Sequence, residues 1–163
     1  MAVAEIIGAA IGVMMLVIVA YMLVGSVLTA AEVVSNAQKD LTLLNEARMR
    51  TDISFFPSSV QIINLIEPNL TFCLNNTGSE VIRDFTHMDV FTTNSNGMTH
   101  YSKATVPEKG YWTIFQFDRD FVHPGMLDPG EAVWINATYE GEIPTTVLVS
   151  TGNGVYTSAI IPS

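Results

Sequence analysis

Residues 6–31 read IIGAAIGVMMLVIVAYMLVGSVLTAA, and this run contains no charged residue between Glu5 and Glu32. At a helical rise of about 1.5 Å per residue, it is longer than the roughly 30 Å of hydrocarbon in a bilayer. A single segment in lipid satisfies its backbone hydrogen bonds only as a helix. The run therefore predicts a transmembrane helix, and the rest of the chain must be arranged after it.

Two other interpretations of this run are weaker. A buried helix of a soluble protein would need surrounding segments to cover it, and the rest of this chain is strand-like. A secretory signal peptide has a basic first region and a shorter apolar core, whereas no Lys or Arg precedes Lys39. We therefore expect a retained anchor.

Small residues recur on one face of the predicted helix. Ala4, Gly8 and Gly12 are four residues apart, a spacing that allows two helices to approach closely in a membrane. The alternative is that glycine is simply frequent in membrane helices. We expect this face to pack against another helix.

The helical pattern continues beyond the membrane segment. An apolar seam with 4-3-4-3 spacing runs through Ala30, Val34, Ala37, Leu41 and Leu44. Such a seam is typical of a coiled coil, but it also fits packing against the chain's own domain. Glu46 and Arg50 are spaced as i,i+4 partners. One helix is therefore predicted to about Arg50, as a stalk that includes residues 1–50.

From Thr51 the apolar residues alternate with period two, which indicates strands. The predicted strands are Ile53–Phe55, Leu70–Leu74, Phe85–Thr92, Tyr111–Phe117, Val133–Tyr139, Thr145–Ser150 and Val155–Ile161. Asp128-Pro129-Gly130-Glu131 has the residues of a type II turn, and Asn153-Gly154 favours a hairpin. Residues 51–163 are thus predicted to form an all-β, immunoglobulin-like antiparallel sandwich.

The composition excludes some partners. Sixteen Asp and Glu residues oppose seven Lys and Arg residues, and an acidic surface repels nucleic acid and anionic lipid. The one cysteine, Cys73, rules out an internal disulfide. Cys73 is expected to be half-buried on an outward face, where an intermolecular role stays open.

Three Asn-x-Thr sequons occur in the β region, at Asn69, Asn75 and Asn136. Each asparagine alternates with core residues, so all three are predicted to face outward. We interpret them as candidate glycosylation sites and as support for an extracytoplasmic β-domain. Lys39, Arg48 and Arg50 follow the span, where the positive-inside rule favours the cytoplasm, but that rule applies poorly to large domains.

The sequence offers little for catalysis. No nucleophile elbow, phosphate loop or paired cysteines occur, so we predict no catalytic residues, no cofactor and no metal site. Two groups of residues are of types that can ligate metals. They are Asp84, His87 and Asp89, and Asp118, Asp120, Asp128 and Glu131, the second group with calcium as its metal. Acidic loops on an acidic protein are usually just solvated.

Several short motifs then form a recognisable series. They are Ala-Gln-x-x-x-x-Leu-Leu-Asn-Glu at 37–46, Thr-x-Ile at 51–53, Asn-Asn-Thr-Gly-Ser at 75–79, Leu-Asp-Pro-Gly-Glu at 127–131 and Asn-Gly-Val at 153–155. After an N-terminal membrane helix, this series resembles the archaellum protein F family. That family comprises archaeal flagellar stator components related to archaellins and type IV pilins.

The resemblance implies a helix in the cytoplasmic membrane, a β-sandwich in the pseudoperiplasm and no catalysis. It also implies contact with the surface-layer protein, with archaellum protein G and with other motor components. A homo-oligomer is a further expectation. The implied function is a structural stator that anchors the archaellum motor between membrane and surface layer.

One departure from the superfamily keeps a second function open. Archaellins and archaeal pilins carry a short basic signal before the apolar helix, and no such stretch precedes Ile6. If Met1 is the true start, we expect no processing as a filament subunit. If the chain is mature, Glu5 takes the place of the pilin assembly glutamate, so a pilin-like filament subunit is the main alternative. A carbohydrate- or peptide-binding receptor domain and an unrecognised hydrolase are further competing classes.

Overall fold

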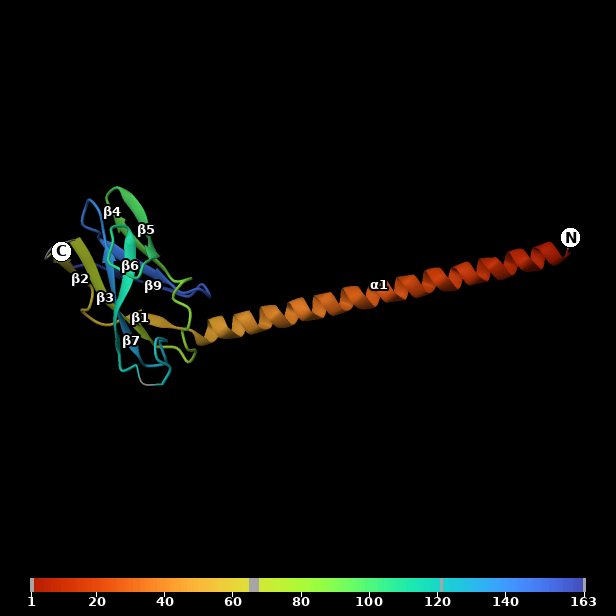
Figure 1. Ribbon diagram of the computed structural model, residues 1–163, viewed down its shortest axis with the longest axis horizontal. Coiled ribbons are helices and arrows are strands. Elements are labelled where there is room, and N and C mark those ends of the chain that lie inside the picture. The colour runs from red at the N-terminus through yellow and green to blue at the C-terminus, as the bar shows by residue number, and fades with distance from the viewer. Residues whose placement is uncertain (1, 65–67, 121, 163) are drawn as a thin grey trace. The chain divides into compact units, whose positions relative to one another are not determined.

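The structure of the protein is a computed structural model that describes residues 2–64, 68–120 and 122–162 (Figure 1). Met1, on which the question of N-terminal processing depends, lies outside the described residues. The chain divides into two compact units, one ending at Leu44 and the other beginning at Asn45. The last residues of the long helix therefore belong to the unit that contains the strands.

The helix α1 spans Ala2–Arg50, so its predicted end at Arg50 is confirmed. Among the described residues, one helix, over Val3–Arg50, is long and apolar enough to cross a membrane. Arg48 and Arg50 lie in its last turn, where positive charges interact favourably with the negative end of the helix dipole. The predicted pair forms at that end, with 3.5 Å between Arg50 Nη1 and Glu46 Oε1.

The rest of the described chain is a β-domain with nine strands. They are β1 (Ile53–Phe55), β2 (Gln61–Asn64), β3 (Pro68–Asn76), β4 (Asp89–Asn94), β5 (Gly97–Lys103), β6 (Tyr111–Asp118), β7 (Ala132–Thr138), β8 (Thr146–Ser150) and β9 (Tyr156–Ile160). The strand order is β1-β3-β7-β6-β5-β4-β8-β9, with β2 also paired to β3. Because β1 and β9, at the two ends of this order, contact each other, the sandwich is nearly closed.

The predicted antiparallel sandwich is confirmed, with one exception in its pairing. β5 forms an antiparallel hairpin with β4 and then a short parallel pairing with β6. In the parallel pairing, Ser102 lies opposite Tyr111 and Lys103 lies opposite Trp112. This pairing joins the layer of β1, β2, β3, β7 and β6 to the layer of β5, β4, β8 and β9.

The core lies between the two layers, and period-two alternation places its side chains there. Leu70, Phe72 and Leu74 of β3 are fully buried, as are Val133 and Ile135 of β7. From the opposite layer, the core receives Val90, Tyr101, Val147 and Val149, and Trp112 of β6 completes it. The facing sets of apolar residues bury each other, which is what the alternation predicts.

One predicted strand begins later than the sequence suggests. β4 starts at Asp89, whereas alternation indicated a start at Phe85. The side chain of Asp84 accepts a hydrogen bond from the backbone N–H of Thr86 at 2.8 Å, and Met88 N–H donates to Phe85 O at 3.4 Å. These local bonds hold a turn and compete with strand pairing. β2 and β5 were not predicted.

Candidate functional site

The predicted packing face of α1 is open. Gly8 and Gly12 meet nothing within 4 Å where a Cβ would stand, and the side chains of this region are exposed. Ala4 lies one turn before Gly8 on the same face. The face has room for another helix, and close packing there stays a prediction.

Two of the three sequons lie side by side in the sheet. In the antiparallel pairing of β3 with β7, Asn69 lies opposite Thr138 and Thr71 lies opposite Asn136. Thr71 Oγ1 donates to Asn136 Oδ1 at 2.8 Å, and Thr138 Oγ1 donates to Asn69 Oδ1 at 2.7 Å. Each sequon threonine thus binds the asparagine of the other sequon.

The third sequon asparagine, Asn75, lies apart from this pair near the end of β3. It is half-buried, and its Oδ1 is enclosed without a hydrogen-bond partner among the described residues. The sequon threonine, Thr77, donates instead to Asp52 Oδ2 at 2.8 Å. Asn75 therefore differs from Asn69 and Asn136, whose Oδ1 atoms each accept a hydrogen bond from a threonine.

A β-bulge in β6 changes which side chains reach the outer face of the same layer. Ile114 lies opposite Ile135 of β7, but Gln116 lies opposite Trp134, so Phe115 is an extra residue between them. A bulge re-aims side chains in this way. As a result Phe115 and Gln116, although consecutive, are both exposed, and Phe115 is 68% exposed.

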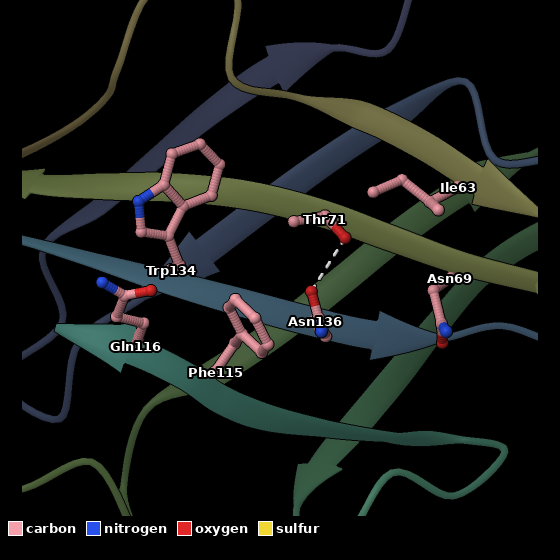
Figure 2. Close-up of a pocket in the computed structure, with 7 residues that line it drawn as sticks. All are labelled: Ile63, Asn69, Thr71, Phe115, Gln116, Trp134 and Asn136. Atoms are coloured by element: carbon pink, nitrogen blue, oxygen red, sulfur yellow. Dashed lines mark hydrogen bonds between the residues drawn. The ribbon is translucent and has the colours of Figure 1, made fainter. Parts of the chain in front are cut away.

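Phe115 and Gln116 of β6, together with residues of β2, β3 and β7, line a pocket of about 410 Å³ on the outer face of these four strands. Its lining consists of Ile63, Asn69, Thr71, Phe115, Gln116, Trp134 and Asn136. In Figure 2, Trp134 and Gln116 lie at one end, Ile63 and Asn69 at the other, with Phe115 and the Thr71–Asn136 bond between them. None of these described lining residues is ionisable.

A second arrangement surrounds the last turn of α1, within the unit that begins at Asn45. The loop after β3 holds the helix end, because Arg50 O accepts Ser79 N–H at 2.8 Å and Glu80 N–H at 3.1 Å. Asp52 O accepts the N–H groups of Thr77 and Gly78, both at 3.0 Å. We call this set of contacts, together with those of the next paragraph, the helix junction.

The β8–β9 hairpin contributes the other half of the helix junction. Asn153 Nδ2 donates to Thr51 Oγ1 at 2.6 Å, and Thr51 Oγ1 donates to Ala47 O at 2.8 Å. Arg48 Nη2 reaches Gly154 O at 3.4 Å. The Asn-Asn-Thr-Gly-Ser and Asn-Gly-Val motifs therefore meet at the end of the helix.

Cys73 is buried, with 3% of its surface exposed, rather than half-buried as expected. The segment after β1 binds its backbone: Phe56 N–H donates to Cys73 O at 2.9 Å, and Ser59 Oγ accepts Cys73 N–H at 3.1 Å. Burial, reinforced by the negative charge of Asp118, raises the pKa of the Cys73 thiol to about 11. The thiol is therefore neutral and shielded.

Each histidine of the chain is paired with an aspartate. The nitrogen–oxygen distances are 2.5 Å for His87–Asp84, 2.8 Å for His100–Asp89 and 2.7 Å for His123–Asp128. Hydrogen bonds from the Thr86 hydroxyl and from His87 hold the pKa of Asp84 well below its usual range. Asp84 and Asp89 thus have different partners, and across residues 2–64, 68–120 and 122–162 no three His, Cys, Asp or Glu side chains are grouped as metal ligands.

Sequence reasoning missed the pocket and the helix junction. A signal for the pocket exists at Trp134, a large aromatic residue at an outward position between the inward Val133 and Ile135. No signal identifies Phe115 and Gln116, since the bulge that turns both outward depends on the pairing with β7.

Comparison with known proteins adds a likeness of fold. No known family profile matches the chain, and no curated protein matches its sequence. The archaellum periplasmic stator protein FlaG from Sulfolobus acidocaldarius shares 17% identity with it, with a TM-score of 0.51 over 68% of this chain and 99% of that chain. The archaellum periplasmic stator protein complex FlaF and FlaG from the same organism gives 18% identity and a TM-score of 0.48, over 65% and 90% of the two chains.

Proposed function

We propose that this protein is a non-enzymatic stator-type component of an archaellum motor. The observation that carries the proposal is the fold: a membrane-length helix precedes a β-domain that resembles the periplasmic stator protein FlaG. The motif series of the sequence supports the more specific assignment to the archaellum protein F family. In this function α1 holds the chain in the cytoplasmic membrane and the β-domain stands in the pseudoperiplasm.

The helix junction supports a mechanical function. A stator resists torque, so force must pass between the membrane helix and the domain that holds a fixed partner. The last turn of α1 is bound by two loops that are far apart in the sequence, the one at Thr77–Glu80 and the one at Asn153–Gly154. Backbone hydrogen bonds from the first loop, and side-chain hydrogen bonds at the second, oppose bending at this point.

The partners in this proposal are the surface-layer protein and archaellum protein G. The β-domain has an excess of carboxylates, and complementary charge on a partner would make the contact weaken with salt. The packing face at Ala4, Gly8 and Gly12 is proposed for contact between helices within the membrane, with a further copy or another motor component.

Deletion of the gene in the native host, with complementation by a tagged copy, tests this function. The deletion strain should be non-motile, and the tagged chain should fractionate with membranes. Surface-layer protein should co-purify through residues 51–163, with less recovered at higher salt. In a strain that carries only residues 1–50, this fragment should still fractionate with membranes, but surface-layer protein should no longer co-purify with it.

The same cells test the filament alternative. A filament subunit must leave the bilayer and pack its apolar helix into a polymer core, so it would be the major protein of sheared extracellular filaments. Recovery there, instead of in membranes, would overturn the stator proposal. Protection of the β-domain from protease in spheroplasts would place it in the cytoplasm and would also contradict it.

A further inference from the structure

We propose that the pocket lined by Phe115, Trp134 and Asn136 is a binding site for a neutral saccharide. The inference goes beyond the proposed function, since it depends on the outer face of β2, β3, β7 and β6 and on nothing in α1. Its failure would leave the stator proposal intact.

The absence of charge from the pocket selects the class of ligand. The chain carries a formal net charge of −9, yet none of the described residues that line the pocket is ionisable. Among the lining residues that the structure describes, a cationic ligand would find no carboxylate and an anionic one would find no Lys or Arg. A neutral ligand is the one that this lining suits, and the volume of about 410 Å³ lies within the range of small-molecule sites.

The side chains present match the two kinds of surface on a sugar ring. A pyranose has apolar C–H faces, which pack on aromatic rings, and a rim of hydroxyl groups, which donate and accept hydrogen bonds. Trp134 and Phe115 supply the aromatic rings, while Gln116 supplies an amide close to both (Figure 2).

The paired sequons supply further donors that are already oriented. The Oδ1 atoms of Asn69 and Asn136 are engaged by Thr138 and Thr71, while neither Nδ2 makes a hydrogen bond with the described residues. Each amide is thus held by its oxygen and offers its two N–H groups to a ligand. Such preorganisation lowers the entropic cost of binding.

The same hydrogen bonds give the Asn and Thr residues of these two sequons a structural role that does not require covalent glycosylation. Both threonines are engaged with the opposite strand, and Thr138 is 1% exposed. An Asn–Thr pair across two strands is a stabilising contact in its own right. The pocket therefore holds a sugar non-covalently, and Asn69 and Asn136 belong to its wall.

A peptide suits this face less well. An extended peptide gains affinity by pairing its backbone with a free sheet edge. In the pocket, β7 is paired on both sides, with β3 and with β6. At β7, the central strand of the pocket, only side chains are therefore offered, which suits a small polar ligand.

The test is a binding titration with the full-length chain in a detergent that has no sugar headgroup. The probes are neutral oligosaccharides that end in glucose, mannose, galactose or an N-acetylhexosamine, with sialylated and sulfated oligosaccharides for comparison. Binding is followed by tryptophan fluorescence, because Trp134 is half-buried in the pocket while Trp112 is fully buried in the core. Calorimetry gives the dissociation constants.

The informative variant is Phe115→Ala, and Tyr156→Ala is its control. Phe115 is 68% exposed and Tyr156 on β9 is 67% exposed, so both truncations should leave the fold intact. We expect at least one neutral probe to bind, with a dissociation constant about tenfold higher for Phe115→Ala and unchanged for Tyr156→Ala. Trp134→Phe should retain binding, and Trp134→Ala should lose it.

Four results would overturn the inference. These are no binding to any neutral probe, preference for the charged probes, equal affinity of Phe115→Ala and the unchanged chain, or glycan mass on Asn69 or Asn136 in protein from the native host. Intact-mass and peptide-mass measurements give the last of these. If the stator phenotype persists while binding fails, the saccharide inference alone is wrong.

Discussion

At the scale of single residues, Cys73 shows how a reactive group becomes inert. Its backbone is hydrogen-bonded on one side by β7 and on the other by Phe56 and Ser59, and the residue is 3% exposed. A thiolate there would lose most of its hydration beside the charge of Asp118, so the neutral thiol is favoured.

We predict that Cys73 in the folded chain resists a thiol reagent at pH 8 and reacts once the chain is unfolded in urea. The raised folded pKa also makes stability depend on pH. The neutral thiol is favoured by folding, so its contribution is complete below pH 9 and is lost as the pH rises towards about 11. Urea midpoints measured at pH 8 and pH 10.5 check this. The variant Cys73→Ala should lose less stability between the two values, and an equal loss would contradict the prediction.

At the scale of elements, the helix junction depends on one glycine. A Cβ on Gly78 would come within 2.5 Å of Arg50 O and would collide with Asp52 N, both of them backbone atoms. Asn76 is fully buried and fixes this loop, since its Nδ2 donates to Glu80 O at 2.8 Å and to Leu127 O at 2.9 Å. The loop therefore cannot move away easily.

We predict that Gly78→Ala lowers the free energy of unfolding of the β-domain by about 2–3 kcal/mol, because the added methyl group forces the junction apart. Thermal unfolding followed by circular dichroism measures the change. Ser79→Ala is the matched control, since it keeps the backbone N–H that donates to Arg50 O and adds no atom. A Gly78→Ala chain with unchanged melting would show that the junction adapts without cost.

The membrane segment of α1 offers a second test at this scale. Replacing both Gly8 and Gly12 with Leu adds bulk where helix backbones would touch but keeps the segment apolar. We predict normal insertion and lost cross-linking to membrane partners. Gly25→Leu is the control, since a Cβ on this glycine also meets nothing within 4 Å but the residue does not belong to the four-residue series. Unchanged cross-linking of the double variant would make the two glycines ordinary helix residues.

At the scale of the whole molecule, the chain combines a unit without a core and a unit with one. α1 exposes apolar side chains along its membrane segment, whereas the β-domain buries a large apolar core. The second unit begins at Asn45, inside the helix, because the last helical turn is bound by the helix junction. Independent folding of the β-domain should therefore improve when this turn is included.

We predict that residues 51–163 and residues 45–163 both fold alone and give β-type circular dichroism spectra. The longer fragment should be more stable by about 1–2 kcal/mol, because Arg50 O then accepts the N–H groups of Ser79 and Glu80. Thermal unfolding of the two fragments makes the comparison. An unfolded or helical spectrum for the longer fragment would contradict an independent sandwich.

The sequence by itself determined the features that depend on local periodicity. The charge-free run at 6–31 determined a helix, because lipid leaves a single segment no other way to satisfy its backbone. The alternation at Leu70, Phe72 and Leu74, and again at Val133 and Ile135, determined strands with one buried face. The turn at Asp128–Glu131 was also predictable, since Gly130 has the φ of 82° that its position in the turn requires.

Only the tertiary structure decided the features that depend on which strands meet. Asn69 and Thr138 are far apart in the sequence, and their hydrogen bond follows from the register of β3 against β7. Phe115 faces the pocket because a bulge opposite β7 turns it outward, and Gly78 is required because the end of α1 passes its Cα. Pairing register and close approach arise between distant segments, so no local pattern of residues encodes them.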